Sequence, residues 1–444
     1  MPRDLVVQIR QNPSADFTLL PSQGGPGYRP GPRGPEPLLP DRGDPGYRPG
    51  PRGPEPLDLE VSLRRHGTAD LLHMSANRPG ERSPLTRGHH AFLDVPATRL
   101  LQRAARLRAA WRDQLVNYQT TDEDGMPLAY PFASAVDLSD QVKLAENRMT
   151  ELAEEGRYLL ETMLEGPDRN LAEFRAFLVG ALTEEGPLRV SFDSDLHLPW
   201  PMMAVDSGPG EPWKDFLGHR HQVEQTGSSY QRIQVAHPTR ARAVTSLNTD
   251  ATLESVGRAP EVRKLLEERT ELTVRTESAR FLEALAGAVL DEDLMYFWCH
   301  GQFVDNGTPF AQLAVRLSDT RDIDADLVRR QRRAHLDEPE ALFRPFVLLN
   351  ACHAGQSAAA ELEHLGRALV ELGARGVLGP QIEIPQVFAA EYAFAFLDLY
   401  LTGEFTAGEI TRELARRFVD DYGNPLALTY SLHCGIDSIL ELTT

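Results

Sequence analysis

The second half of the chain alternates short apolar runs with amphipathic stretches, and this alternation limits the folds that it can adopt. From Pro187 onward the strand candidates are LRVSFDS, RIQVAH, ELTVRT, LMYFWCHG, PFVLLNAC, GVLGPQ and TYSLHC. Helix candidates between them include APEVRKLLEER, SARFLEALAGAVL, QVFAAEYAFAFLDLYL and AGEITRELARRFVDDY. Such alternation predicts an α/β fold with a mostly parallel sheet flanked by helices. In such folds, reactive side chains lie at the carboxyl ends of the strands.

The part of the chain before Pro187 has a different pattern. Residues 98–116 and 141–165 place apolar residues at helical spacing, which predicts a helical region over 97–186 in front of an α/β domain at 187–444. Residues 1–24 predict short N-terminal strands around an Asn-Pro-Ser turn, and residues 59–96 a strand and loop lead-in.

A repeat separates these two strand regions. The string PGYRPGPRGPEPL at Pro26 to Leu38 recurs identically at Pro45 to Leu57. Proline removes backbone donors and glycine raises the entropy cost of ordering the chain, so residues 25–58 are expected to form a disordered linker.

Composition narrows the class of protein. The 444 residues carry a formal net charge of −19, which argues against direct binding of nucleic acid. Three cysteines suit a reducing compartment better than a disulfide framework. We find no signal peptide in the first residues, and the most apolar helix candidate carries Glu391 and Asp398, so no membrane association is expected. The expected location is the cytoplasm.

Two of the predicted strands end in residues that carry chemistry. LMYFWCHG ends at His300 and Gly301, and PFVLLNAC ends at Cys352. Adjacent parallel strands would place His300 and Cys352 at the same edge of the sheet, where an imidazole and a helix N-terminus both favour the thiolate. Gly301 leaves room for a substrate carbonyl, so the backbone amides of Gly301 and Cys352 are candidates for an oxyanion hole.

Each residue also has a simpler interpretation. Cys352 alone could be a buried packing residue, and His300 a hydrogen-bonded core histidine. A zinc site built from Cys299, His300, Cys352 and His353 is a further alternative. Adjacent strand residues point to opposite faces, which disfavours that site, so no metal or cofactor is predicted. Cys299 and Cys434 are assigned to packing.

The two strand ends resemble those of the CHAT proteases, caspase-like cysteine peptidases related to caspases and separases. The matching strings are FWCHG at Phe297 to Gly301 and LLNACHAG at Leu348 to Gly355, supported by LRVSFDSDLHLPW and GARGVLGPQIEIP. The spacing of 52 residues between the histidine and the cysteine is similar to the roughly 50 residues of caspases. The resemblance implies a Cys-His dyad with Cys352 as nucleophile, His300 as its partner, and Asn350 and Gly355 as supporting motif residues.

The resemblance also implies a biological role. CHAT proteases commonly act in bacterial antiviral defence, held inactive until a partner senses infection, and some cleave gasdermin-like precursors. A protein substrate and an activating or sensor protein encoded nearby are therefore the expected partners. Glu383 could line a pocket for a basic substrate residue, although a solvated loop carboxylate is an alternative. A catalytically silent sensor or scaffold, and a non-proteolytic thiol hydrolase, remain alternative functions.

Overall fold

The computed structural model describes most of the chain beyond the Pro/Gly repeat. The described residues are 55–66, 70–79, 89–122, 126–194, 196–208, 210–227, 240–304, 312–335, 342–353 and 362–443. The strands expected in 1–24, most of the linker expected in 25–58, and the strand expected at RIQVAH lie outside these ranges.

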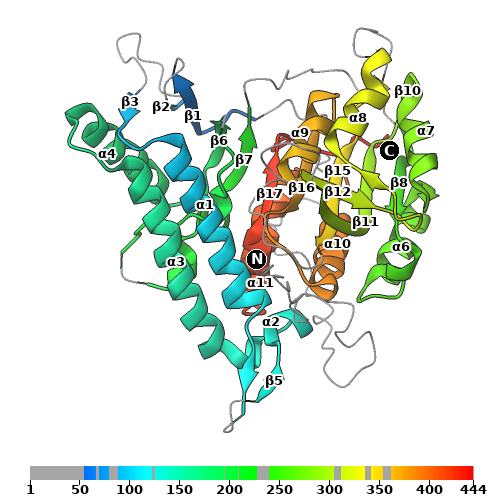
Figure 1. Ribbon diagram of the computed structural model, residues 1–444, viewed down its shortest axis with the longest axis horizontal. Helices are drawn as coiled ribbons and strands as arrows, with labels where there is room; N and C mark the ends of the chain where they lie inside the picture. Colours follow the sequence, from blue (N-terminus) through cyan, green and yellow to red (C-terminus); the bar gives the residue numbers. More distant parts are fainter. Residues whose placement is uncertain are drawn as a thin grey trace, which may run out of the picture.

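One sheet of thirteen strands runs through the described part of the molecule (Figure 1). Its strand order is β13-β12-β11-β15-β16-β17-β7-β6-β1-β2-β3, and β8 pairs with both β11 and β9. The strands are β1 (Leu59–His66), β2 (Leu71–Asn77), β3 (His89–Leu93), β6 (Arg189–Ser194), β7 (Gln222–Thr226), β8 (Ala243–Thr249), β9 (Thr270–Arg275), β11 (Leu294–Val304), β12 (Gln312–Arg316), β13 (Asp322–Ile323), β15 (Phe346–His353), β16 (Gly376–Pro380) and β17 (Tyr430–His433). Two small ladders pair β4 (Thr120–Thr121) with β5 (Pro127–Ala129) and β10 (Val289–Leu290) with β14 (Leu342–Phe343).

Each half of the sheet contains a group of parallel strands, and the two groups run in opposite directions, while β12 and β13 in one half and β2 and β3 in the other pair antiparallel. Strands β9, β8, β11, β15 and β16 are mutually parallel, and so are β17, β7, β6 and β1. The halves meet where β16 pairs antiparallel with β17, from Val377 opposite His433 to Pro380 opposite Tyr430. The predicted α/β fold with a mostly parallel sheet is therefore confirmed.

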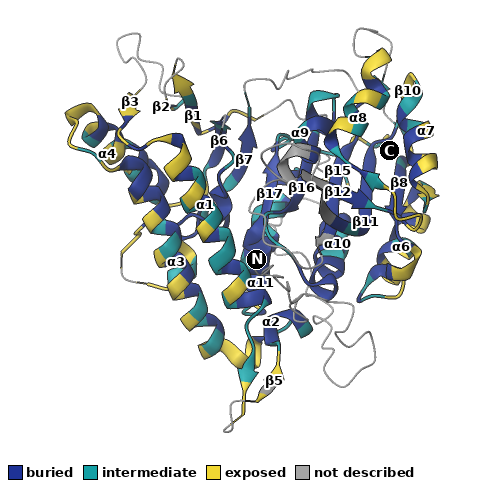
Figure 2. Ribbon diagram, in the orientation of Figure 1, coloured by how far each residue is buried: buried dark blue, intermediate teal, exposed yellow. Residues whose placement is uncertain are grey.

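Helices cover both faces of the sheet, and Figure 1 shows α1, α3 and α4 over one half and α6 to α9 around the other. The helices are α1 (Ala97–Trp111), which continues as a π-helical turn at Arg112–Val116, α2 (Pro131–Ser134), α3 (Val142–Leu164), α4 (Arg169–Thr183), α5 (Leu217–Arg220), α6 (Ala259–Arg269), α7 (Ser278–Ala286), α8 (Ala325–Arg332), α9 (Leu362–Glu371), α10 (Gln386–Tyr400) and α11 (Ala407–Asp420). Their exposed sides face solvent and their buried sides face the strands (Figure 2).

Two hydrophobic cores lie on opposite faces of the sheet. The larger core joins the helices before residue 187 to α6, α10 and α11, and it includes Tyr296 and Trp298 of β11. The smaller core joins α7, α8 and α9 to the alternate residues Phe297 and Cys299. Strands on both sides of residue 187 share one sheet and one core. The boundary between a helical region at 97–186 and an α/β domain at 187–444 stays a prediction.

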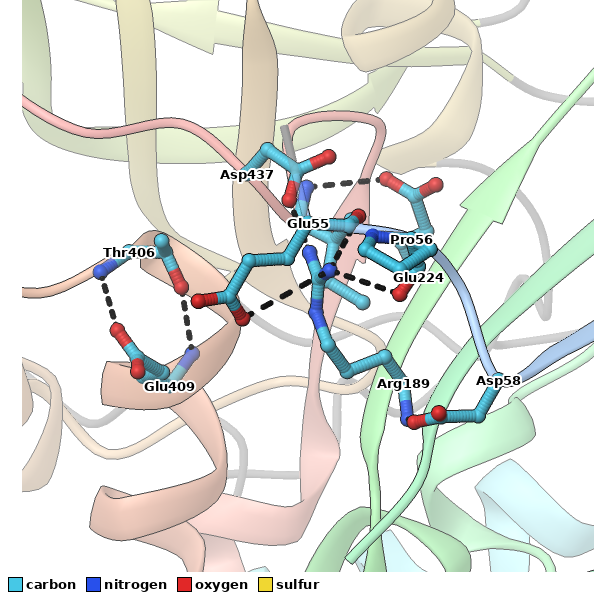
Figure 3. A network of polar contacts seen from close by, with 9 residues as sticks. Glu55, Pro56, Asp58, Arg189, Glu224, Thr406, Glu409 and Asp437 are labelled. Atoms are coloured by element: carbon cyan, nitrogen blue, oxygen red, sulfur yellow. Dashed lines mark hydrogen bonds and ion pairs between the residues drawn. The ribbon is translucent and has the colours of Figure 1, made fainter. Parts of the chain in front are cut away.

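The segment that leads into β1 is anchored at the start of β6 (Figure 3). The Arg189 guanidinium donates to the carbonyl oxygens of Glu55 and Pro56 and forms an ion pair with Asp437. The Asp58 side chain accepts a hydrogen bond from the Arg189 backbone N–H at 2.8 Å. The last residues of the linker expected at 25–58 thus have a charged partner distant in sequence, and the extent of the linker stays a prediction.

Candidate active site

The strands that carry the two proposed catalytic residues are direct neighbours. β11 and β15 pair in parallel, with Leu294 opposite Phe346 at one end and His300 opposite Cys352 near the carboxyl edge. Both strands are buried apolar runs up to this edge, which suits the centre of a parallel sheet. For Cys352 the structure describes the backbone, and Gly355 lies outside the described residues.

β11 does not end at the histidine. It continues to Val304, and beyond His300 it pairs antiparallel with β12, so that Gly301 lies opposite both Val315 and His353. The sequence suggested a strand that stops at Gly301. The extension was not visible there because it depends on pairing with β12, which is distant in sequence.

The His300 side chain faces a carboxylate that the sequence analysis missed. Its Nε2 lies 3.7 Å from Oδ2 of Asp250, and the two side chains are 28% and 8% exposed. Asp250 directly follows β8, the neighbour of β11, and caps the 3-10 turn at Ala251–Leu253. The string AVTSLNTD has β-branched residues and ends in this aspartate, so recognition of β8 as a strand would have revealed it.

Asn350 lies inside the sheet two residues before the cysteine. Its side chain is buried, donates to the Ala389 carbonyl of α10 at 2.9 Å, and accepts from the Tyr430 hydroxyl at 2.8 Å. These bonds fix β15 to α10 and to the first residue of β17. Asn350 therefore holds the strand that leads to Cys352.

Glu383 lies in the loop between β16 and α10, which follows the strand next to β15. Burial raises the pKa of its carboxyl from 4.5 to about 7, while Arg112 lowers the pKa and Asp113 raises it. The same loop is attached to α1, because Arg108 donates to the Gln381 side chain at 2.9 Å. Glu383 is partly buried, and its place in a substrate pocket stays a prediction.

Of the four residues in the zinc alternative, the structure describes the side chains of Cys299 and His300. Cys299 is fully buried in the smaller core, on the face of α7 to α9, whereas His300 reaches Asp250. Across the described residues, no group of three or more His, Cys, Asp or Glu side chains is arranged to hold a metal ion. Cys434 packs against the smaller core but is only half-buried.

Comparison with known proteins identifies the family. The CHAT domain model matches residues 154–408, more than half of the chain, and the chain therefore belongs to the CHAT domain family. The predicted resemblance to the CHAT family is therefore confirmed.

Individual relatives are more distant. A probable protease of Vitiosangium sp. (strain GDMCC 1.1324) is 30% identical over 139 residues, which cover 31% of this chain and 17% of that protein. Among solved structures, the Saccharomyces cerevisiae separase in its complex with securin has a TM-score of 0.45 at 9% identity, covering 85% of this chain and 30% of that chain. Gingipain R, an Arg-specific cysteine proteinase, has a TM-score of 0.39 at 10% identity, covering 68% and 75%.

None of the helices in the described ranges combines the length and the apolar character needed to cross a membrane.

Proposed function

We propose that this chain is a cysteine endopeptidase in which Cys352 is the nucleophile and His300 is its general base or ion-pair partner. The observation that carries the proposal is the register of β11 and β15, which pairs the His300 backbone with the Cys352 backbone at the carboxyl edge of a CHAT-family sheet. A histidine and a cysteine at neighbouring strand ends form the arrangement that activates a thiol.

The proposed reaction has two steps. The Cys352 thiolate attacks the scissile carbonyl carbon, and His300 donates a proton to the leaving amine as the C–N bond breaks. Water then attacks the thioester and gives its proton to His300, and the Cys352 thiolate leaves as the new carboxyl group forms, which restores the starting ion pair. The backbone amides of Gly301 and Cys352 are the proposed donors to the oxyanion that forms in each step.

Other residues have supporting roles in this proposal. Asn350 fixes the strand that carries the nucleophile, and Gly355 belongs to the motif by its resemblance to CHAT proteases. Glu383 is proposed to line the pocket for a basic substrate residue. Its partly buried carboxyl would gain a counter-charge there, and ionisation of Glu383 would accompany binding.

We further propose that the enzyme works in the bacterial cytoplasm as part of a defence system. A partner protein encoded nearby would activate it. Its substrate would be a protein such as a gasdermin-like precursor. In this proposal the partner shifts a pre-existing equilibrium towards an aligned dyad. Addition of the partner should then accelerate alkylation of Cys352 by iodoacetamide, while Cys299, which is fully buried, stays protected.

The central test compares new peptide N-termini in a bacterial lysate treated with the wild-type chain, Cys352→Ala or His300→Ala, each with the partner present. We expect cleavage by the wild type and none by either variant. Cys434→Ser is the matched control, because it changes a half-buried cysteine away from the proposed dyad and should leave cleavage intact. Equal cleavage by wild type and Cys352→Ala would refute the proposal.

The alternatives give different results in the same experiment. A thiol hydrolase would be inactivated by alkylation of Cys352 without producing new peptide N-termini. A silent scaffold would bind its partner equally well as wild type and as Cys352→Ala, with no cleavage by either.

A further inference from the structure

We propose that Asp250 is a positioning residue for His300, holding the Nε2 side of the imidazole so that Nδ1 exchanges the proton with Cys352. This inference rests on the proposed function, and it adds a third residue to the dyad. The carrying observation is the 3.7 Å separation between Asp250 Oδ2 and His300 Nε2.

The Asp250 carboxylate is itself held in one orientation. Its Oδ1 accepts hydrogen bonds from the backbone N–H and the hydroxyl of Thr252, both at 2.9 Å. With Oδ1 committed to the cap of the 3-10 turn, Oδ2 is the oxygen that faces His300. The side chain is only 8% exposed, so water screens its charge weakly.

The turn that carries Asp250 is attached to the strand that carries His300. The Asp250 backbone N–H donates to the Trp298 carbonyl at 3.1 Å, which extends the β8–β11 pairing by one bond. The buried Trp298 indole returns a hydrogen bond to the Leu253 carbonyl at 3.0 Å. Asp250 and His300 therefore keep a fixed relation, because both are built on the same pair of strands.

The chemical consequence follows from the charge. His300 becomes an imidazolium when it takes the thiol proton, and a poorly solvated carboxylate beside Nε2 stabilises that cation. A separation of 3.7 Å is longer than a hydrogen bond. Contacts of this kind commonly shorten when substrate binds.

The variant Asp250→Asn removes the negative charge of the side chain while keeping its shape. Asparagine keeps an oxygen that can accept from Thr252 and is an equally good cap, so the turn should remain folded. We expect kcat to fall by about tenfold to a hundredfold while KM changes less than twofold, and Asp250→Glu to recover part of kcat. Asp168→Asn is the matched control, because Asp168 caps α4 through Leu171 at 3.1 Å and is not part of the site.

A second readout does not depend on cleavage. In the side-chain ¹⁵N spectrum of the histidines, with the His300 signals assigned by loss in His300→Gln, we expect Asp250→Asn to shift those signals and Asp168→Asn to leave them unchanged. Identical His300 signals in wild type and Asp250→Asn would overturn the inference, as would an unchanged kcat. A shift of the ring signals in a chain that cleaves nothing would support the contact and refute the peptidase instead.

Discussion

The Tyr430 hydroxyl and the Asn350 side chain, 80 residues apart in the chain, share a buried hydrogen bond of 2.8 Å. Asn350 lies on β15 two residues before the proposed nucleophile, and Tyr430 begins β17. This one bond therefore connects the proposed active site to the strand at which the two halves of the sheet meet.

Tyr430→Phe should lower both stability and activity. It leaves the Asn350 oxygen buried without this donor, which costs about 1–3 kcal/mol of unfolding free energy. Thermal denaturation and kcat are the measurements. Tyr400→Phe is the matched control, since it removes a buried hydroxyl contact with Ser438 away from the site and should lower stability alone. Equal losses of kcat in the two variants would contradict the assigned role of Asn350.

Glu383→Gln should stabilise the protein more at high pH than at low pH. The pKa of the carboxyl is about 7 in the folded chain and near 4.5 when unfolded, so the folded state binds the extra proton between these values. The contribution of Glu383 to wild-type stability therefore decreases as pH rises through this window, whereas glutamine has no such dependence. Melting temperatures at about pH 5 and about pH 8 test the difference. The exposed Glu404→Gln should show no such trend.

His433→Gln should weaken the loss of stability in acid. Burial, together with the nearby His197 and Arg108, lowers the pKa of His433 from 6.5 to about 3. Between these values His433 binds a proton in the unfolded chain that it does not bind in the folded chain, so its contribution lowers the unfolding free energy as pH decreases. The slope of melting temperature against pH should become shallower in the variant. The exposed His66→Gln is the control, and an unchanged slope in His433→Gln would contradict the prediction.

Two deletions should separate the linker from its anchored end. Removal of residues 1–54 is expected to leave the melting temperature unchanged. Removal of residues 1–58 also takes away Asp58 and the carbonyl groups that Arg189 binds, and it should lower the melting temperature by about 1 °C for each kcal/mol lost. Arg189→Gln should have a similar effect, and equal melting of both deletions would show that the anchor contributes nothing.

Local sequence patterns predicted the elements that have strong periodicity. The expected helix APEVRKLLEER coincides with α6, and TYSLHC contains β17, because amphipathic or apolar spacing marks such elements directly. β7 and β8 were missed because their polar residues break the apolar run of a buried strand. The antiparallel contact of β16 with β17 also could not be predicted, since register between distant strands depends on tertiary packing.

The candidate site, like the fold, could be predicted from the sequence only where local patterns mark its residues. The residues at the ends of apolar strands were recognised, and their strands do lie side by side. Asp250 was not, because a single aspartate after an unrecognised strand has no local signature. The environment of Glu383 depends on Arg112 and Asp113, which approach only after α1 packs on the sheet.

Arg189 binds both Pro56 and Asp437, so separating these two residues by force would first break the contacts of its guanidinium. One guanidinium binds the carbonyl groups at the entrance of β1 and the carboxylate after β17, so it joins the first and last strands of the described fold. Tension on the repeat-rich segment would thus be carried by a side chain at the start of β6. The strands that bear His300 and Cys352 would be shielded from that load.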